Sequence, residues 1–255
     1  MWMEVGVLGN NIKVLCIIPA RYHSTRFPGK PLIEINGIPM IKRTYSQAAK
    51  SSALTDLVVA TENQKIVDYC KSEGLSVVMT SDDCLTGTDR LAEVAKKQEY
   101  KGYDLYINVQ GDEPVIDSIV IDQIITQYKI HGNKYIAYNL YKIICDQSEI
   151  NSDSIIKVIV NQDDELMYMS RLPVPYSKSK LAAVYKMQVP VYGYTAEALE
   201  VFSAHQKTIN EKFEDVELLR FVDLGYKLKM TETKATSIAV DVPNDLLKVE
   251  AYLCE

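Results

Sequence analysis

Short apolar runs alternate with amphipathic segments of about ten residues along the first half of this chain, and this rhythm limits the folds open to it. We expect strands at Val14–Ile18, Asp56–Ala60, Leu75–Met79 and Asp104–Val109, and helices at Met40–Lys50, Asn63–Ser72, Thr88–Gln98 and Asp117–Lys129. Within the third helix, Leu91, Val94 and Ala95 fall on one face. Strand, short loop and helix repeated in this way predict an α/β fold with a mostly parallel sheet covered by helices on both faces.

The second half of the chain has a different pattern. We expect a hairpin of Ile156–Val160 and Leu166–Met169, a strand at Met187–Tyr194, and helices at Ala196–Ala204, Phe213–Leu224 and Pro243–Leu253. We see no internal repeat, low-complexity tract or flexible linker. We therefore predict a single domain over residues 1–255, with an N-terminal extension at 1–12 and an inserted arm or subdomain at about 135–195.

Composition bears on partners and compartment. The formal net charge of −6 argues against nucleic acid as the main partner. No apolar run approaches the ~20 residues of a membrane-spanning helix, and no signal-peptide pattern opens the chain. The five cysteines are scattered without C-x-x-C spacing, which is typical of free thiols in a reducing compartment. We expect a cytoplasmic protein that contacts neither membrane nor nucleic acid.

The loop after the first strand carries three cations, Arg21, Arg26 and Lys30. Ligands of open α/β sheets bind at the carboxyl ends of strands, which is where this loop begins. Neither the P-loop pattern nor G-x-G-x-x-G is present. The loop therefore predicts a site for a polyanion, most simply a nucleoside triphosphate, held by side-chain cations as well as backbone amides.

Carboxylates follow two other predicted strands. Asp112 comes directly after the run that ends at Val109, and a carboxylate beside a triphosphate suits Mg²⁺. The alternative is that Asp112 and Glu113 are loop acids before a helix. Asp241 also ends a strand-like run, and there the alternative is a cap of the last helix. The more specific interpretation is that Asp112 and Asp241 both bind a metal ion.

A further polar segment, Thr86 to Arg90, lies between a strand and a helix. Small hydroxyls, a glycine and a cation at a helix N-terminus are suited to reading a base or a phosphate. The alternative is a capped helix start, with Asp89 favoured by the helix dipole.

Taken together, these motifs resemble those of the CMP-Kdo synthetase family, the 3-deoxy-manno-octulosonate cytidylyltransferases. The matching segments are Ile17–Leu32, Gly87–Arg90, Asn108–Pro114, Ser170–Pro175 and Val240–Asp245. Their order and spacing cover nearly the whole chain. The resemblance implies a nucleotidyltransferase-type, Rossmann-like α/β fold, a homodimer formed through the inserted region, CTP as substrate and Mg²⁺ as cofactor.

The resemblance also implies roles for individual residues. Arg21 and Lys30 would contact the triphosphate and the reacting phosphate, with Arg26 in the same loop. Thr86, Arg90 and Gln110 would help to read cytosine. Asp112 and Asp241 would bind magnesium and, with Arg21 and Lys30, form the catalytic set. The sugar acid would be bound by Arg171, Gln188, Tyr192, Glu217 and Leu218.

Two departures from the family pattern fall on the expected sugar-acid side. Gln188 stands where the family usually has a histidine, with Pro190 in place of a glycine, and Leu218 stands where it has a glutamine. A site built to hydrogen-bond a hydroxyl discriminates strongly when that pairing changes. Two alternatives follow: a modified or related ulosonic acid as acceptor, or Kdo held by compensating contacts.

The expected reaction is that of CTP with a 3-deoxy-2-ulosonic acid to give a CMP-sugar and pyrophosphate, as in the synthesis of lipopolysaccharide or capsule. Two other functions stay open at this point. One is a nucleotidyltransferase for a different sugar acid or nucleotide, and the other is a non-catalytic nucleotide-binding homologue.

Overall fold

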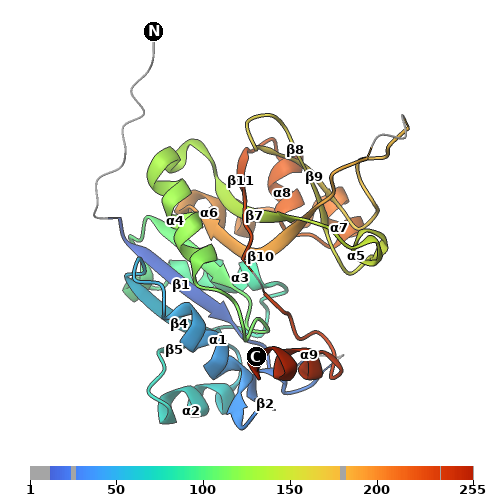
Figure 1. Ribbon diagram of the computed structural model, residues 1–255. Helices are drawn as coiled ribbons and strands as arrows, with labels where there is room; N and C mark the ends of the chain where they lie inside the picture. The colour runs from blue at the N-terminus through green and yellow to red at the C-terminus, as the bar shows by residue number, and fades with distance from the viewer. Residues whose placement is uncertain (1–11, 24–26, 179–181, 236, 255) are drawn as a thin grey trace.

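The computed structural model describes residues 12–23, 27–178, 182–235 and 237–254. Its main sheet runs in the order β11-β7-β10-β6-β1-β4-β5, which Figure 1 shows across the middle of the molecule. These strands are β1 (Val14–Pro19), β4 (Asp56–Thr61), β5 (Val77–Met79), β6 (Leu105–Val109), β7 (Ala137–Ile143), β10 (Lys186–Tyr194) and β11 (Leu228–Glu232). The predicted N-terminal extension and Arg26 lie outside the described residues, apart from Ile12.

The strand directions place several loops at one edge of this sheet. β1 runs parallel to β4 and β6, and β7 runs parallel to β11. β10 lies between β6 and β7 and is antiparallel to both. The carboxyl ends of β1, β6 and β7 therefore point the same way, beside the amino end of β10. The prediction of a mostly parallel sheet is confirmed.

Helices cover both faces, as predicted. On one side are α1 (Met40–Ala48), α2 (Gln64–Ser72) and α4 (Ile119–His131); on the other are α3 (Gly87–Lys96), α6 (Ala196–Ala204) and α8 (Leu218–Asp223). Strand β1 shows why. Val14 and Cys16 pack in the core beneath α1, α2 and α4, and Leu15 and Ile17 pack in the core beneath α3, α6 and α8. A strand buried on both faces reads as the continuous apolar run seen in the sequence.

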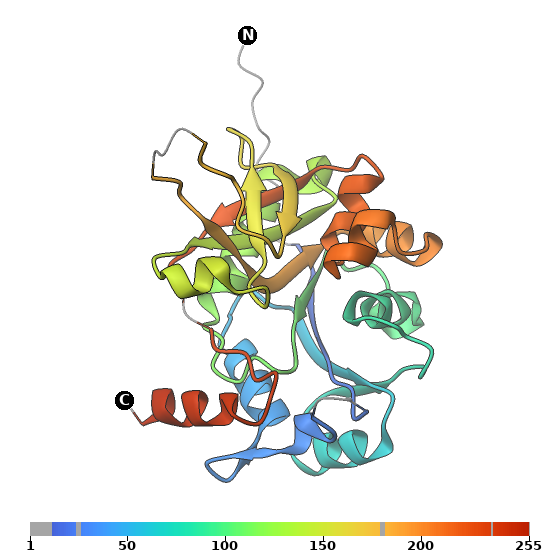
Figure 2. The same cartoon turned by 90° about the vertical axis from the view of Figure 1, so that its right-hand side faces the viewer.

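The predicted hairpin is confirmed as β8 (Lys157–Val160) and β9 (Leu166–Ser170). Figure 2 shows it in yellow, and its buried side chains Val158, Leu166 and Met169 pack in the same core as those of α8. The remaining elements are β2 (Glu34–Ile35), β3 (Ile38–Pro39), α5 (Gln147–Asn151), α7 (Ile209–Glu214), α9 (Asp245–Leu253) and the 3-10 turns Lys30–Leu32, Gln98–Tyr100 and Gly132–Lys134. Among the described residues, none of the helices combines the length and apolarity needed to cross a bilayer.

Two sequence expectations are corrected by the structure. The predicted insertion at 135–195 includes β7 and β10, which are strands of the main sheet, and β8 extends the same sheet by pairing with β10 and β9. The single helix predicted at Phe213–Leu224 is two helices, α7 and α8. Asp215 separates them because it adopts a left-handed conformation, with φ of 51°, that a right-handed helix cannot continue through.

Candidate active site

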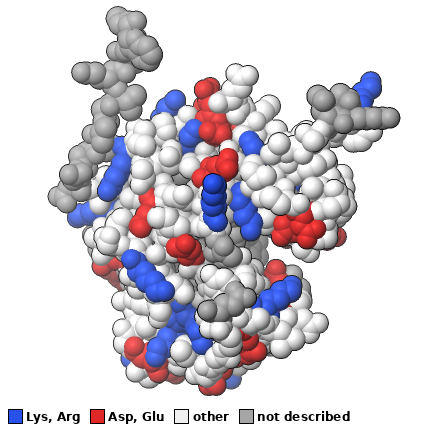
Figure 3. All heavy atoms as spheres, in the orientation of Figure 1, with Lys and Arg blue, Asp and Glu red and all other residues white. Residues whose placement is uncertain are grey.

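Two cavities open at the edge where β1, β6 and β7 end, and they share Gln110 and Asp112. The loop cavity, of about 500 Å³, is lined by the segment after β1, the start of α3 and the segment between α6 and α8. The β10 cavity, of about 760 Å³, is lined by the start of β10, the segment after α5 and residues 235–248. Figure 3 shows the surface hollowed between the upper and lower halves of the molecule on the right-hand side, where α5 and α9 face each other.

Asp112 reaches the junction because the chain after β6 passes directly under the loop that follows β1. A Cβ atom on Gly111 would lie 2.7 Å from the backbone oxygen of Pro19, so this approach requires glycine. The Lys30 ammonium then lies 2.6 Å from Asp112 Oδ2 and donates a second hydrogen bond, of 2.8 Å, to the carbonyl oxygen of Val240. The basic loop and the first predicted metal carboxylate are thus in direct contact.

The second predicted metal carboxylate is brought to the same place by a small apolar core. Val115 and Val240, which lie close in sequence to Asp112 and Asp241, pack together in this core with residues of α1 and α9. The backbone N–H of Val240 donates to the carbonyl oxygen of Asp112 over 2.9 Å. Two segments far apart in the sequence are therefore fixed side by side.

The environment of Glu113 reflects this crowding of acids. Glu113 is buried, and its burial raises its pKa to about 8, with the nearby charges of Asp112 and Asp241 adding to the shift. The Ser237 hydroxyl donates to its carboxylate and partly opposes the shift. The Glu113 carboxyl is therefore mostly protonated at neutral pH. Its two acidic neighbours are Asp112 and Asp241.

The capping interpretation of Asp241 is wrong in this structure. The N-cap residue of α9 is Asn244. The Asp245 carboxylate, in the first turn of α9, accepts the backbone N–H groups of Asp241 and Val242 over 3.0 and 3.1 Å. This fixes the turn that carries Asp241 toward the β10 cavity, whose lining includes both residues.

The donor set at the junction fits a magnesium ion that is completed by its substrate. No group of three or more His, Cys, Asp or Glu side chains in the described parts of the chain could form a complete metal cage. Mg²⁺ typically takes only one or two protein carboxylates, with phosphate oxygens and waters filling its octahedral shell. Asp112 and Asp241 supply such a pair beside a cavity that contains Arg21 and Lys30.

Thr86 caps helix α3 and also lines the loop cavity. It is the N-cap of α3, its hydroxyl accepting the N–H of Asp89 over 3.1 Å while the Asp89 carboxylate accepts the N–H of Thr86 over 2.9 Å. The capped helix start is therefore confirmed. Thr86 also lines the loop cavity with Gly87 and Gln110, so the cap presents its outer side to any ligand there.

Arg90 does not line either cavity, and its predicted contact with a base is corrected. Its side chain is 1% exposed and forms an ion pair of 3.1 Å with Glu62, and it also donates to Thr80. The other oxygen of the Glu62 carboxylate accepts the backbone N–H of Tyr22 over 2.8 Å. Arg90 therefore holds the loop that carries Arg21 from behind, as a positioning residue.

Gln188 and Tyr192, which the resemblance assigns to the sugar acid, line the β10 cavity. Gln188 is 8% exposed, and its Nε2 atom has no hydrogen-bond partner among the described residues. A buried amide donor without a partner is costly, and such a group in a cavity wall is a strong candidate for a ligand contact. Tyr192 stacks on Tyr194 with 6.0 Å between ring centroids, and burial raises the pKa of its hydroxyl.

Comparison with known proteins agrees with this geometry. The chain matches the family described as Cytidylyltransferase over residues 15–230. It is 37% identical to the 3-deoxy-manno-octulosonate cytidylyltransferase of Chlamydia pneumoniae over 241 residues, which cover 94% of each chain. The chain belongs to the 3-deoxy-manno-octulosonate cytidylyltransferase family.

Two further relatives bear on the two cavities. The chain is 37% identical to the 8-amino-3,8-dideoxy-manno-octulosonate cytidylyltransferase of Shewanella oneidensis, over 95% of this chain and 99% of that one. A solved CMP:2-keto-3-deoxy-manno-octonic acid synthetase, complexed with CTP, superposes with a TM-score of 0.88 at 33% identity, over 95% of this chain and 98% of that one. The nucleotidyltransferase fold expected from the sequence is therefore confirmed.

Within this cytidylyltransferase, the structure corrects two of the predicted sugar-acid contacts. The Arg171 guanidinium donates to the carbonyl oxygens of Glu214 and Asp153, over 2.7 and 2.8 Å, and lines neither cavity. Leu218 is fully buried in the core between α8 and the sheet. A leucine there is a packing residue, so its replacement of the family's glutamine does not by itself alter a polar pocket.

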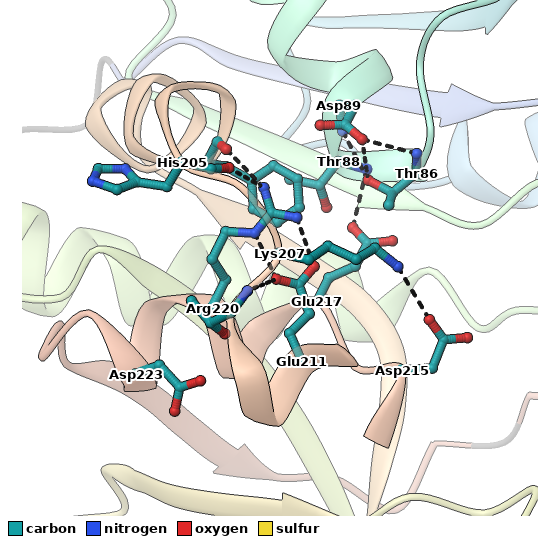
Figure 4. Close-up of polar contacts among 12 residues, drawn as sticks. Thr86, Thr88, Asp89, His205, Lys207, Glu211, Asp215, Glu217, Arg220 and Asp223 are labelled. Carbon is teal, nitrogen blue, oxygen red and sulfur yellow. Dashed lines mark hydrogen bonds and ion pairs between the residues drawn. The ribbon is translucent and has the colours of Figure 1, made fainter. Parts of the chain in front are cut away.

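Glu217 lies at the loop cavity and not at the β10 cavity. Its carboxylate accepts the backbone N–H of Thr88 over 3.1 Å, and Figure 4 shows it directed toward the start of α3. Burial raises the pKa of this carboxyl. Glu217 lines the loop cavity together with Thr86, whereas the resemblance assigns Glu217 to the sugar acid.

Several charged residues that line the cavities are not among the predicted site residues, and Lys207, Asp215 and Lys142 are three of them. Lys207 and Asp215 line the loop cavity and form an ion pair of 3.3 Å (Figure 4). Their segment is anchored by Arg220, which makes a buried pair of 2.6 Å with Glu211. Lys142, at the end of β7, lines the β10 cavity. None of the three lies in a recognisable motif; the only local signal is the capping box of Thr208 and Glu211 at the start of α7.

Proposed function

We propose that this protein transfers the CMP group of CTP to the anomeric hydroxyl of a 3-deoxy-2-ulosonic acid and releases pyrophosphate. The observation that carries the proposal is the junction of the two cavities, where Lys30 contacts Asp112 over 2.6 Å between a basic pocket and a second, wider one. Supporting it are the names of the relatives and the CTP complex of the solved synthetase.

CTP would occupy the loop cavity. Arg21 and Lys30 line it from the segment after β1 and would neutralise the triphosphate. Thr86, Gly87 and Gln110 form its inner wall and would face the nucleoside. A Cβ atom on Gly87 would come within 3.6 Å of both the Asn108 and Gln110 amide nitrogens, so the glycine keeps a small space open next to two hydrogen-bond donors.

The chemistry asks mainly for positioning and charge stabilisation. The acceptor hydroxyl would approach the α-phosphorus from the β10 cavity, with pyrophosphate leaving on the opposite side. Lys30, held by Asp112 and the Val240 carbonyl, is placed to stabilise the charge that develops on the α-phosphate. Asp112 and Asp241 would hold Mg²⁺, which when bound polarises the phosphate and lowers the pKa of a coordinated hydroxyl.

The acceptor would lie in the β10 cavity against Gln188 and Tyr192. Because Leu218 is a core residue, the case for an acceptor other than Kdo now rests on Gln188 and Pro190. The chain is 37% identical to both the Kdo relative and the amino-Kdo relative, so identity does not choose between them. We therefore propose the ulosonic acid class, with Gln188 as the residue that sets preference within it.

We also propose a homodimer in the cytoplasm. The segment between β9 and β10 carries the exposed apolar side chains of Leu172, Tyr176 and Val184, at 71%, 87% and 60% exposure. Exposed apolar side chains on one segment are suited to contact with a second copy. All five cysteines are free, which favours a reducing compartment. Light scattering of the purified protein would test the dimer.

The direct test is pyrophosphate release from CTP and Mg²⁺ with Kdo, 8-amino-8-deoxy-Kdo, a sialic acid or no acceptor. We expect release that depends on one of the two octulosonic acids. UTP and dTTP in place of CTP test the nucleotide. Binding of CTP with no release for any acceptor would contradict the proposal and favour the non-catalytic homologue.

A further inference from the structure

We propose that Lys142 receives the carboxylate of the acceptor in the β10 cavity. This assignment rests on the proposed function and names the residue that recognises the negative charge of a sugar acid. No motif pointed to Lys142, and the residue expected to steer the carboxylate, Arg171, is held elsewhere by backbone carbonyls.

The sheet places Lys142 at the correct edge. It lies near the carboxyl end of β7, opposite Met187 at the start of β10. β7 and β6 are parallel and are separated by β10 alone, so they lie about 10 Å apart, two strand spacings. Asp112 follows β6 at the same edge. A long lysine side chain from β7 can therefore reach an acceptor that reacts beside Asp112, and both residues line the β10 cavity.

The charges of the β10 cavity make this lysine unusual. The acids in its lining are Asp112, Glu113, Glu149, Asp241 and Asp245, and the cations are Lys142 and Lys248. Lys248 is committed to Asp245 over 2.8 Å and is 69% exposed. Lys142 is half-buried, and its ammonium makes no ion pair or hydrogen bond within the described residues. A cavity dominated by acids repels an anionic ligand unless a cation is available, and Lys142 is in that position.

Two neighbouring lysines are committed to other partners. The ammonium of Lys186 stacks over the Tyr141 ring at 4.5 Å and does not line the cavity. The Lys157 ammonium donates to the carbonyl oxygens of Ser152 and Ile155 over 2.6 and 2.7 Å.

The carboxylate is the charged group common to 3-deoxy-2-ulosonic acids, and it is attached to the carbon that bears the reacting hydroxyl. Lys30 also lies at the junction, but its ammonium is held by Asp112 and by the carbonyl oxygen of Val240. Lys142 is the lysine of the β10 cavity that has no such partner among the described residues.

The experiment compares Kdo, or whichever acceptor the wild type uses, with the neutral primary amide of the same sugar. The variants are Lys142→Met, Lys142→Arg and, as a control that removes a neighbouring positive charge from β10 outside the cavity lining, Lys186→Met. For each we would measure kcat, KM for the acceptor and KM for CTP, together with the melting temperature.

We expect Lys142→Met to raise KM for the acid roughly 10- to 100-fold, the range for a lost hydrogen bond to a charged group. KM for CTP and for the amide should stay within about twofold, so the preference of the wild type for the acid disappears. Lys142→Arg should restore part of the affinity, and Lys186→Met should behave as the wild type.

Two results would overturn the assignment. One is an unchanged KM for the acid in Lys142→Met; the other is an equal increase for acid and amide, which would place Lys142 against hydroxyl groups. Failure of the proposed function looks different, because the wild type itself would then release no pyrophosphate with any sugar acid. If Lys142→Met has a lowered melting temperature, Lys142→Arg becomes the deciding variant. A Lys142→Arg protein whose KM for the acid is as high as that of Lys142→Met would contradict the proposal.

Discussion

The loop cavity and the β10 cavity share Gln110 and Asp112, yet they are built in different ways. Most of the loop cavity comes from residues that directly follow β1 and β6 or begin α3. The β10 cavity is assembled from residues scattered between 110 and 248, on strands, loops and the turn before α9. The residues of the loop cavity are therefore fixed by the strands of the main sheet. In the β10 cavity, where the acceptor is proposed to bind, single residues can be substituted without altering that sheet.

The largest effect should come from the residue common to both cavities. We expect Asp112→Asn to lower kcat roughly 100- to 1000-fold or more, because it removes a metal carboxylate and the partner of Lys30. The fold should persist, since the Asp112 side chain is 28% exposed. Steady-state kinetics with CTP and Mg²⁺, together with circular dichroism, would measure both effects.

Asp241→Asn should act in the same way, and Asp163→Asn, in an exposed turn, is the matched control. Near-normal turnover in either the Asp112 or the Asp241 variant would remove the metal role that we assign to that residue. It would also break the view that both cavities depend on one shared junction.

Glu113 provides a second test of that junction through pH. Its pKa is raised from 4.5 to about 8 in the folded protein, so the folded state binds a proton more tightly than the unfolded state does. Its contribution to stability is therefore fully present below about pH 4.5 and is lost as the pH rises to about 8. We expect the free energy of unfolding, measured with urea in the absence of divalent cations, to fall by on the order of 3 kcal/mol across this range.

Glu113→Gln should flatten this dependence, because the amide cannot ionise beside Asp112 and Asp241. At pH 8 and above the variant should be more stable than the wild type. Identical pH profiles for the two proteins would show that burial and the neighbouring acids do not raise the pKa of Glu113 in the folded protein.

Prediction from sequence placed residues correctly where they follow a buried strand. Arg21 and Asp112 come shortly after such strands and line the cavities at the sheet edge, as the pattern indicates, and Lys30 lies in the same loop as Arg21. Arg90 failed for a non-local reason, since its charge is paired with Glu62, which precedes it by α2 and β5 in the chain. The break between α7 and α8 also escaped, because Asp215 adopts a left-handed conformation that no glycine marks in the sequence.

The acceptor side could be predicted only in part. Gln188 and Tyr192 were found through a motif on β10, but Lys142 lies in no motif and reaches the cavity only through the pairing of β7 with β10. Leu218 and Glu217 are adjacent in sequence, yet one faces the core and the other the loop cavity. A helix sends neighbouring side chains in different directions, so a motif alone does not say which residue meets a ligand.

Leu218 sharpens the comparison, because the resemblance placed it on the acceptor side and the structure places it in the core. We expect Leu218→Gln, which restores the family's glutamine, to lower stability by about 1–3 kcal/mol, since it buries an amide without partners. Acceptor preference should not change. Urea unfolding and the ratio of kcat/KM for Kdo and 8-amino-8-deoxy-Kdo would measure the two properties.

Leu247→Gln is the matched control, because Leu247 is 67% exposed on α9 and the same substitution should cost little there. A Leu218→Gln variant that keeps its stability and shifts its acceptor preference would return residue 218 to the sugar-acid site.

The smallest effect should come from Gln188. Gln188→Leu removes the unpartnered amide donor, so we expect KM for the acceptor to rise roughly 2- to 10-fold, the range for one neutral hydrogen bond. KM for CTP should not change, because Gln188 lines only the β10 cavity. Stability should hold or increase, since an apolar group of similar size replaces a buried group that lacks a partner.

Gln188→His, which restores the family's residue, separates affinity from preference. If Gln188 sets the acceptor, the histidine variant should change the ratio of kcat/KM between Kdo and its relatives while the leucine variant lowers both. Met187→Leu, at the adjacent position of the same cavity wall, is the control for packing alone. An equal rise in KM for CTP and acceptor in Gln188→Leu would mean that the two cavities are coupled through β10, and the independence of the acceptor side would have to be abandoned.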